Sequence, residues 1–237
     1  MPSFDELWPN GPKFKQSADG FRLGTDSVLL ADFAARGRHK NIIDLGCGAG
    51  VLTVLLQSAY PSARVVGIEI QPAAAELARE NMAINGYAGE IITGDMRCHR
   101  ALFAAGSFDL VVANPPYFPL SSGMPSPDER RAGARGEREC TLSDVCQAAA
   151  YLCRWGGSFS LVHRPERLAE VFSALRENGL EPKRLRCVQH RQSAPPNLVL
   201  IEARRGAKPT LEFAAPLLLT NAAGSESDES KRIYSRT

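Results

Sequence analysis

The tetrapeptide Asn114-Pro115-Pro116-Tyr117 combines residue types that together can hold a planar amino group. Two consecutive prolines cannot continue the hydrogen bonding of a strand or open a helix in the ordinary way, so they predict a rigid extended turn. Such a turn can aim the side-chain oxygen of Asn114 and the carbonyl oxygen of Pro115 at the two N–H bonds of an amine, while Tyr117 stacks on an attached ring. We therefore predict that these residues orient an amino nitrogen as a nucleophile, with orientation and desolvation as the main sources of catalysis.

A glycine-rich loop lies upstream of this turn. It reads D-x-G-x-G-x-G, with Asp44 two positions before Gly46 and with further glycines at Gly48 and Gly50. Glycine is needed where the backbone turns with positive φ or approaches a ligand closely. The spacing differs from the G-x-G-x-x-G loop that presents a helix to a pyrophosphate, which argues against an NAD dehydrogenase. An acidic residue instead suits a ligand with cationic groups, and S-adenosylmethionine carries a sulfonium and an ammonium group.

Two more acidic residues are predicted to complete the cofactor site. Glu69 ends a strand-like segment about 20 residues after the loop, the position from which a carboxylate accepts hydrogen bonds from ribose hydroxyls. Its neighbour Ile70 belongs to the same predicted site. Asp95 follows the next strand-like segment, where it can accept from an adenine amino group while Met96 packs on the ring. Either acid alone would be a surface loop residue, but their order after successive strands predicts an S-adenosylmethionine site.

These motifs lie at the ends of segments that the sequence predicts to be strands of one sheet. Four of the segments are apolar and rich in β-branched residues, as in parallel strands buried on both faces: Asn41–Leu45, Arg64–Ile70, Phe108–Ala113 and Ser158–Val162. A further strand-like segment is Glu90–Thr93. Two later segments predict a hairpin at the sheet edge: Lys183–His190 and Asn197–Ala203. Helical patterns alternate with the strands, including Asp26–Ala35, Val145–Leu152 and Pro165–Glu177.

This alternation predicts an α/β, Rossmann-like fold. We expect a mostly parallel seven-stranded sheet with helices on both faces and a C-terminal edge hairpin, in which ligands bind at the carboxyl ends of the strands. A chain of 237 residues is long enough for one sizeable core with small appendages. We predict an N-terminal extension over residues 1–40 that covers the cofactor site, a catalytic domain over 41–205, and a C-terminal extension with a polar tail over 206–237.

Composition narrows the class of protein further. The six cysteines form no C-x-x-C pair, which argues against a zinc site and a redox dithiol, so we predict no metal and reduced thiols. No segment approaches the roughly 20 apolar residues that cross a bilayer, and the first residues lack the order of a signal peptide. We therefore expect a cytoplasmic protein without a membrane partner. Because the formal net charge is only +2, any binding of nucleic acid would depend on local clusters of basic residues.

Taken together, the sequence resembles the class I S-adenosylmethionine-dependent methyltransferases and, within them, the bacterial tRNA adenine-N6 methyltransferase family. The resemblance runs from Phe14-Lys15-Gln16 through Gly24–Ala31 to Leu161–Leu168, and Gly24–Ala31 is its most specific part. It implies methylation of the exocyclic N6 amino group of an adenine in RNA, with tRNA as the expected substrate. It also implies that the helix beginning near Thr25 and Asp26 covers the methionine end of the cofactor, and it places Gln16 in the same site. Thr25 alone also fits a helix N-cap.

The residues leave the substrate open between several classes. RNA binding requires basic side chains around the active-site mouth. Four candidates lie in the polar loop after Tyr117, although interleaved acids also fit a solvated loop: Arg130, Arg131, Arg135 and Arg138. A glutamine side-chain amide in a protein presents a similar planar amino group, but glutamine-N5 methyltransferases usually carry a longer domain before the glycine loop. Adenine in another nucleic acid is a third class, although the chain has no separate target-recognition domain.

Overall fold

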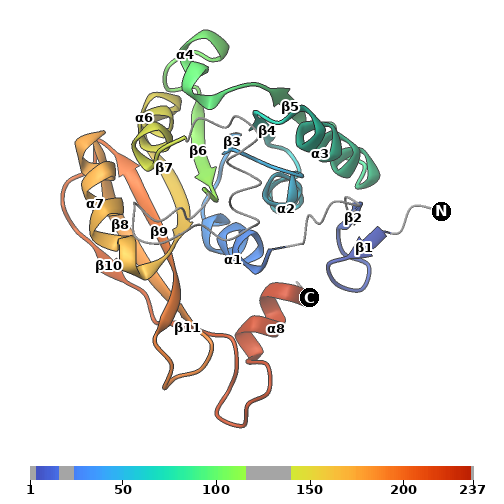
Figure 1. Ribbon diagram of the computed structural model, residues 1–237, viewed down its shortest axis with the longest axis vertical. Helices are drawn as coiled ribbons and strands as arrows, with labels where there is room; N and C mark the ends of the chain where they lie inside the picture. Colours follow the sequence, from blue (N-terminus) through green and yellow to red (C-terminus); the bar gives the residue numbers. More distant parts are fainter. Residues whose placement is uncertain (1–3, 16–23, 116–139, 236–237) are drawn as a thin grey trace, which may run out of the picture.

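The computed structural model describes residues 4–15, 24–115 and 140–235. A nine-stranded sheet forms its centre, with the strand order β10-β8-β9-β7-β6-β3-β4-β5 and with β11 also paired to β8 (Figure 1). The central strands are parallel: β3 (Asn41–Leu45), β4 (Arg64–Glu69), β5 (Glu90–Thr93), β6 (Phe108–Ala113) and β7 (Cys153–His163). They are followed on one side by an antiparallel hairpin of β8 (Leu180–Gln189) and β9 (Pro196–Arg205).

Neighbouring residues of each strand enter two different hydrophobic cores, because side chains alternate between the faces of a sheet. Ile42 packs in the core that contains the helices α1 (Thr25–Ala34), α2 (Val51–Ala59) and α3 (Pro72–Ile84). Ile43 packs in the opposite core with α6 (Leu142–Leu152) and α7 (Leu168–Glu177). Strands buried on both faces are mostly apolar, and this explains why their apolar runs are continuous rather than alternating.

Local sequence signals set the ends of several helices. Pro72 is the first residue of α3. Proline is tolerated there because an N–H at the first helical position would have no acceptor within the helix. The start of α6 has a full capping box, in which the Thr141 hydroxyl accepts from the Asp144 N–H and the Asp144 carboxylate accepts from the Thr141 N–H. Three short helical segments join the larger elements: η1 (Met96–Cys98), α4 (His99–Leu102) and η2 (Pro165–Arg167).

The seven predicted strands are confirmed, and the sheet gains two more. The short strands β10 (Glu212–Phe213) and β11 (Leu217–Leu218) pair in parallel with β8 and cover an edge that would otherwise present unpaired backbone groups. The strand predicted at Ser158–Val162 is also longer, because β7 begins at Cys153.

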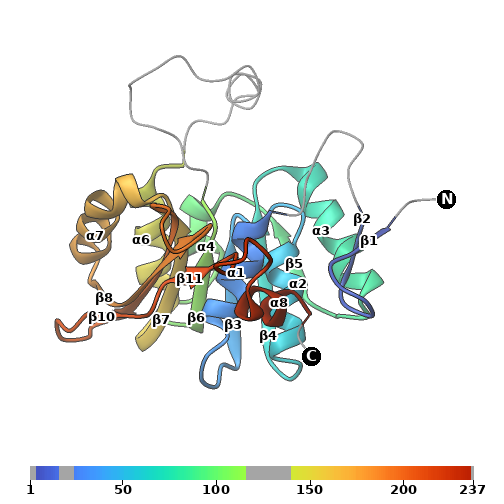
Figure 2. The same cartoon turned by 90° about the horizontal axis from the view of Figure 1, so that it is seen from below.

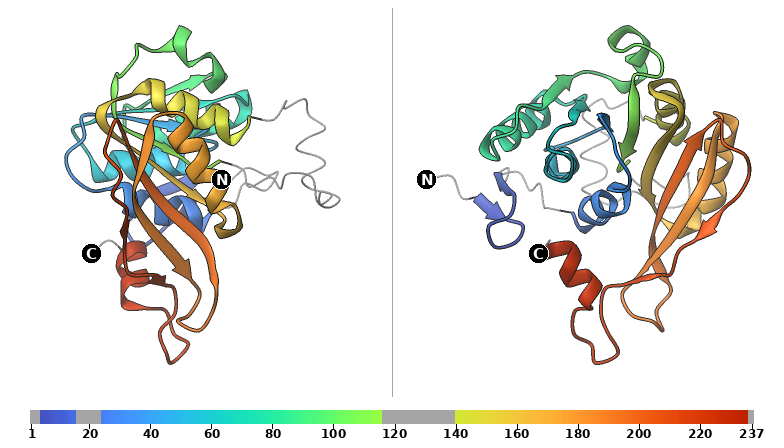
Figure 3. Two further views of the ribbon diagram at one scale, coloured as in Figure 1. Left: turned by 90° about the vertical axis from the view of Figure 1, so that its left-hand side faces the viewer. Right: turned by 180° about the vertical axis from the view of Figure 1, so that it is seen from behind.

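The two ends of the chain both pack on the layer that contains α1 and α3. The hairpin of β1 (Phe4–Glu6) and β2 (Lys13–Lys15) lies beside α3, and Phe14 is buried there. The last helix, α8 (Asp228–Ser235), lies beside α1, as Figures 2 and 3 show. Ile233 of α8 is 1% exposed, and Arg232 pairs with Asp32 of α1 at 3.1 Å. Across the described ranges, no helix has both the length and the apolar character to cross a membrane.

Candidate active site

The predicted site residues follow three neighbouring strands at the same edge of the sheet. Leu45 of β3 pairs with Ile68 of β4 and with Ala113 of β6. The next residues along these strands are Gly46, Glu69 and Asn114. The register therefore brings the glycine loop, the second acidic residue and the start of the proline turn together at the carboxyl edge, where ligands bind in open α/β sheets.

The glycine loop adopts the left-handed backbone that its sequence predicts. Gly46, Gly48 and Gly50 have φ values of 72°, 53° and 81°. The Gly46 N–H donates to the Ile68 carbonyl at 2.9 Å, which ties the loop to β4. A Cβ on Gly50 would lie 3.0 Å from the Cβ of Ala78, so a larger residue would push α2 away from α3. Only glycine meets both the conformational and the packing requirement here.

Two buried carboxylates, Asp44 and Glu69, lie beside this loop. Asp44 is 1% exposed and accepts a hydrogen bond from the Thr53 hydroxyl at 2.7 Å. Burial raises the pKa of Asp44 to about 7; the Thr53 hydrogen bond opposes this rise and the charge of Glu69 adds to it. Glu69 is also buried and accepts from the backbone N–H groups of Gly48 and Gln71, each at 2.9 Å. Within the described part of the chain, neither carboxylate forms a salt bridge with a lysine or arginine.

This arrangement fits a cationic ligand. Buried carboxylates are costly unless an opposite charge compensates them, and a sulfonium or ammonium group would supply that charge. Because Gly46, Gly48 and Gly50 carry no Cβ, a ligand can approach the backbone of the loop closely. The residues therefore fit S-adenosylmethionine, which the sequence predicts here.

Asp95 and Met96 lie at the far side of the glycine loop. Asp95 caps η1 by accepting from the Arg97 N–H at 2.9 Å, and it forms an ion pair with the Arg97 guanidinium at 2.6 Å. The Arg97 hydrogen bonds lower the pKa of Asp95, so it stays ionised as an acceptor. The Met96 methyl group lies 3.3 Å from the position of a Gly46 Cβ, which places this side chain against the loop. Ile70, at the end of β4, is 47% exposed and available for contact.

Asn114 is held by a residue that the sequence analysis did not single out. Its Nδ2 donates to the Ser27 hydroxyl of α1 at 3.1 Å. An asparagine amide has one acceptor oxygen and two donor hydrogens, so this bond identifies Nδ2 as the donor and Oδ1 as the atom of Asn114 that can accept. The adjacent Pro115 is buried. Ser27 belongs to Gly24–Ala31, the most specific segment of the resemblance. Its place in that segment was the signal by which Ser27 could have been singled out.

The start of α1 also differs from the prediction in detail. Gly24, rather than Thr25, is the N-cap, so Thr25 is the first residue of the helix and its predicted alternative role as a cap is wrong. The Thr25 side chain is instead hydrogen-bonded with Tyr234 of α8. Asp26 is half-buried beside Ser27. Since Ser27 contacts Asn114, this end of α1 lies at the active-site edge.

Several predicted residues lie outside the described ranges: Gln16, Pro116, Tyr117, Arg130, Arg131, Arg135 and Arg138. Their roles stay predictions. In the ranges that are described, no group of three His, Cys, Asp or Glu side chains is placed to hold a metal ion. The cysteines there are free thiols, and burial raises the pKa of Cys146 and Cys153 to about 12.

Comparison with known proteins supports the same chemistry. A model of the methyltransferase small domain matches residues 16–122. A Porphyromonas gingivalis protein named tRNA1(Val) (adenine(37)-N6)-methyltransferase is 32% identical over 228 residues, which cover 92% of this chain and 89% of that protein. A protein of the same name from Yersinia pseudotuberculosis is 29% identical over 197 residues, covering 80% of this chain and 75% of the relative.

Solved structures show the same fold. A predicted O-methyltransferase from Agrobacterium tumefaciens superimposes with a TM-score of 0.72 at 23% identity, covering 89% of this chain and 95% of that one. TrmN from Thermus thermophilus has a TM-score of 0.56 at 18% identity and covers 76% of this chain and 48% of that one. The resemblance seen in the sequence is thus confirmed, and the chain belongs to the family of S-adenosylmethionine-dependent methyltransferases whose curated members are named tRNA1(Val) (adenine(37)-N6)-methyltransferases.

Proposed function

We propose that this protein transfers the methyl group of S-adenosylmethionine to the N6 amino group of an adenine in tRNA, namely adenine 37 of a valine tRNA. The observation that carries the proposal is the position of Asn114: it follows β6 beside the acidic glycine loop, and its Nδ2 donates to the Ser27 hydroxyl of α1. The names of relatives that match most of the chain support adenine in tRNA as the substrate.

The chemistry required of the protein is mainly orientation. S-adenosylmethionine supplies an electrophilic methyl group. An exocyclic amine on an aromatic ring is a weak nucleophile, because its lone pair is delocalised into the ring. Asn114 Oδ1 and the Pro115 carbonyl would accept its two N–H bonds and favour a tetrahedral nitrogen whose lone pair faces the methyl group. No strong base is needed for this attack, since the nitrogen loses its proton readily once it carries the new bond.

The negative charge of Asp44 would hold the cationic end of the cofactor, and Glu69 would accept hydrogen bonds from its ribose hydroxyls. Asp95 would accept a hydrogen bond from the adenine amino group, and Met96 would cover the adenine ring, as the sequence predicts. Ile70 would lie nearby. Thr25 and Asp26 would face the methionine end from the start of α1, together with Gln16. These roles would form one site along the carboxyl edge of β3, β4, β5 and β6, which are neighbours in the sheet.

The substrate is expected to reach the site as an unpaired base. An adenine in an anticodon loop can leave its stack at lower cost than a base in a duplex. We propose that Arg130, Arg131, Arg135 and Arg138 contact its phosphates, and that the protein acts in the cytoplasm without a metal. We also propose that residues 1–40 and 206–237 are extensions of a catalytic domain at 41–205.

The test is transfer of labelled methyl from S-adenosylmethionine to bulk tRNA and, separately, to a protein extract. Nucleoside analysis of the tRNA is expected to show N6-methyladenosine, and the Asn114→Ala protein serves as the inactive control. Label in protein glutamine with none in RNA would contradict the proposal and favour the glutamine-N5 reaction. Label on a different nucleoside would contradict the assignment of adenine.

A further inference from the structure

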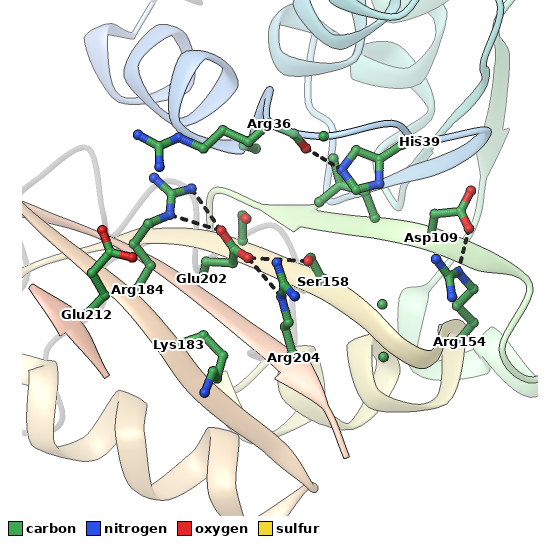
Figure 4. Close-up of a pocket in the computed structure, with 16 residues that line it drawn as sticks. Arg36, His39, Asp109, Arg154, Ser158, Lys183, Arg184, Glu202, Arg204 and Glu212 are labelled. Atoms are coloured by element: carbon green, nitrogen blue, oxygen red, sulfur yellow. Dashed lines mark hydrogen bonds and ion pairs between the residues drawn. The ribbon is translucent and has the colours of Figure 1, made fainter. Parts of the chain in front are cut away.

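A cavity of about 490 Å³ opens at the edge of the sheet opposite to the glycine loop. Its walls come from the segment between α1 and β3, from the start of β6, and from β7, β8, β9 and β10 (Figure 4). Asp109, the second residue of β6, accepts from the backbone N–H groups of Lys40 and Asn41 at the start of β3. The cavity therefore lies at the amino ends of the parallel strands and is separate from the candidate active site.

The lining carries an excess of positive charge. It contains five basic side chains against three acidic ones: Arg36, Arg154, Lys183, Arg184 and Arg204 against Asp109, Glu202 and Glu212. Two of the acids are already engaged within the protein. Glu202 pairs with Arg184 at 2.8 Å and with Arg204 at 3.3 Å, and Asp109 pairs with Arg154 at 2.6 Å. The cavity is thus left with a net charge of about +2, which attracts an anion.

Two of the arginines lie close together at one end of the cavity. Arg184 is 4% exposed and is fixed by Glu202, by the Phe33 carbonyl at 2.8 Å and by the face of the Phe33 ring at 3.5 Å. Figure 4 shows the guanidinium of Arg36 beside that of Arg184. Arg36 is exposed and has no carboxylate at ion-pair distance in the ranges that the structure describes. Neighbouring guanidinium groups of this kind match the geometry of a phosphate.

An exposed aromatic ring lies on the rim of the same cavity. Trp155 is 74% exposed, and its chain neighbours Arg154 and Gly156 both line the cavity. The ring packs over Gly206, two residues beyond Arg204, because a Cβ on Gly206 would lie 2.3 Å from it. Trp155 belongs to an irregularity in β7, where the pairing with β6 shifts between Phe108 and Leu110. Such bulges re-aim side chains at functional sites, and here the bulge turns the indole toward solvent.

We propose that this cavity binds a phosphorylated nucleotide, with the phosphate at the guanidinium groups of Arg36 and Arg184 and the base stacked on Trp155. An aromatic platform beside a cationic groove is the arrangement by which proteins hold nucleotides without reading their sequence. The ligand is either a free nucleotide or one nucleotide of an RNA strand, since both present the same phosphate and base. The site lies at the opposite edge of the sheet from Asn114 and therefore goes beyond the proposed methyl transfer.

Tryptophan fluorescence tests this proposal directly. The chain has two tryptophans, so the Trp8→Phe variant reports on Trp155 alone. S-adenosylhomocysteine at saturating concentration keeps the cofactor site filled, and uridine 5′-monophosphate is the probe because it lacks the adenine of the cofactor. We expect saturable quenching by uridine 5′-monophosphate and none by uridine. Binding should weaken by about tenfold in the Arg36→Gln variant, because a charge-assisted contact to the phosphate is lost.

The matched control is Arg176→Gln on α7, which removes another exposed arginine outside the cavity and should leave the quenching unchanged. An oligouridylate of twelve nucleotides distinguishes the two sources: tighter binding than the mononucleotide indicates an RNA strand, and equal binding indicates a free nucleotide. Binding of labelled uridine 5′-monophosphate to the Trp155→Ala variant gives a second readout and should be reduced. Absence of saturable quenching by both probes, or quenching that persists unchanged in the Arg36→Gln variant, would overturn the proposal.

Discussion

The affinity for S-adenosylmethionine should fall as the pH is lowered through 7, because Asp44 must lose its proton to compensate a cationic ligand. Asp44 is fully buried, and burial raises its pKa to about 7 even though the Thr53 hydroxyl donates to it. A raised pKa of an acid means that the neutral form dominates below pH 7 and the carboxylate above it. The positive groups of the cofactor favour the carboxylate, so binding is strong on the alkaline side and weak on the acidic side.

The size of the effect follows from this pKa. If only the ionised form of Asp44 binds the cofactor, the apparent Kd exceeds its limiting value about 11-fold at pH 6 and about 1.3-fold at pH 7.5. The expected change between these two pH values is therefore about eightfold, or about 1.3 kcal/mol. Replacing Thr53 with valine removes the hydrogen bond that lowers the pKa of Asp44, so the midpoint should move to higher pH.

Calorimetric titration of the protein with S-adenosylmethionine measures this dependence. The Asp44→Asn variant is the control: it should bind more weakly at pH 7.5 and show no comparable change between pH 6 and 7.5. A wild-type Kd that is constant over this range would refute the reasoning. The same pH dependence in Asp44→Asn would assign the titration to another group.

Three further predictions concern the site and its scaffold. Asn114→Ala should abolish methyl transfer while the calorimetric Kd for the cofactor stays within about tenfold; loss of cofactor binding would contradict the role of Asn114 in holding the amine. Ser27→Ala should lower kcat by up to about tenfold with little change in cofactor affinity, because Asn114 loses one hydrogen bond. Ser27→Thr keeps a hydroxyl and should retain more activity. Equal kcat values for the wild type and Ser27→Ala would argue against positioning by Ser27. Gly50→Ala should lower the free energy of unfolding by about 1–3 kcal/mol in a denaturant titration. The loss should be larger than for Gly86→Ala, because Gly86 has a similar φ but a Cβ there would have no neighbour within 4 Å. Equal losses would show that the contact with Ala78 is unimportant.

The parallel strands could be predicted from the sequence because their central residues are buried and form continuous, mostly apolar runs. The predicted bounds of β3, β5 and β6 match those in the structure. The first part of β7 could not be predicted, since Trp155, Gly156 and Gly157 read as a turn and become strand only through a bulge against β6. The strands β10 and β11 are two residues each, too short to carry a periodic pattern, and they form by tertiary pairing with β8.

The site was predictable where chemistry demands particular residue types at short spacing. The glycine loop requires positive φ, and the register of parallel strands brings Glu69 and Asn114 to the same edge. Contacts between distant segments were not predictable. Ser27 and Asn114 are 87 residues apart, and nothing in their local sequence shows that they meet. The burial of Asp44, which sets its pKa, likewise depends on how α2 packs over β3.

The most direct test of the central claim is methylation of an unmodified valine tRNA transcript that carries adenine at position 37, compared with the same transcript carrying guanine there. The account predicts one methyl group per tRNA, recovered as N6-methyladenosine, with no transfer to the guanine transcript. Equal labelling of both transcripts would contradict adenine 37 as the target, and absence of labelling in both would contradict this tRNA as the substrate.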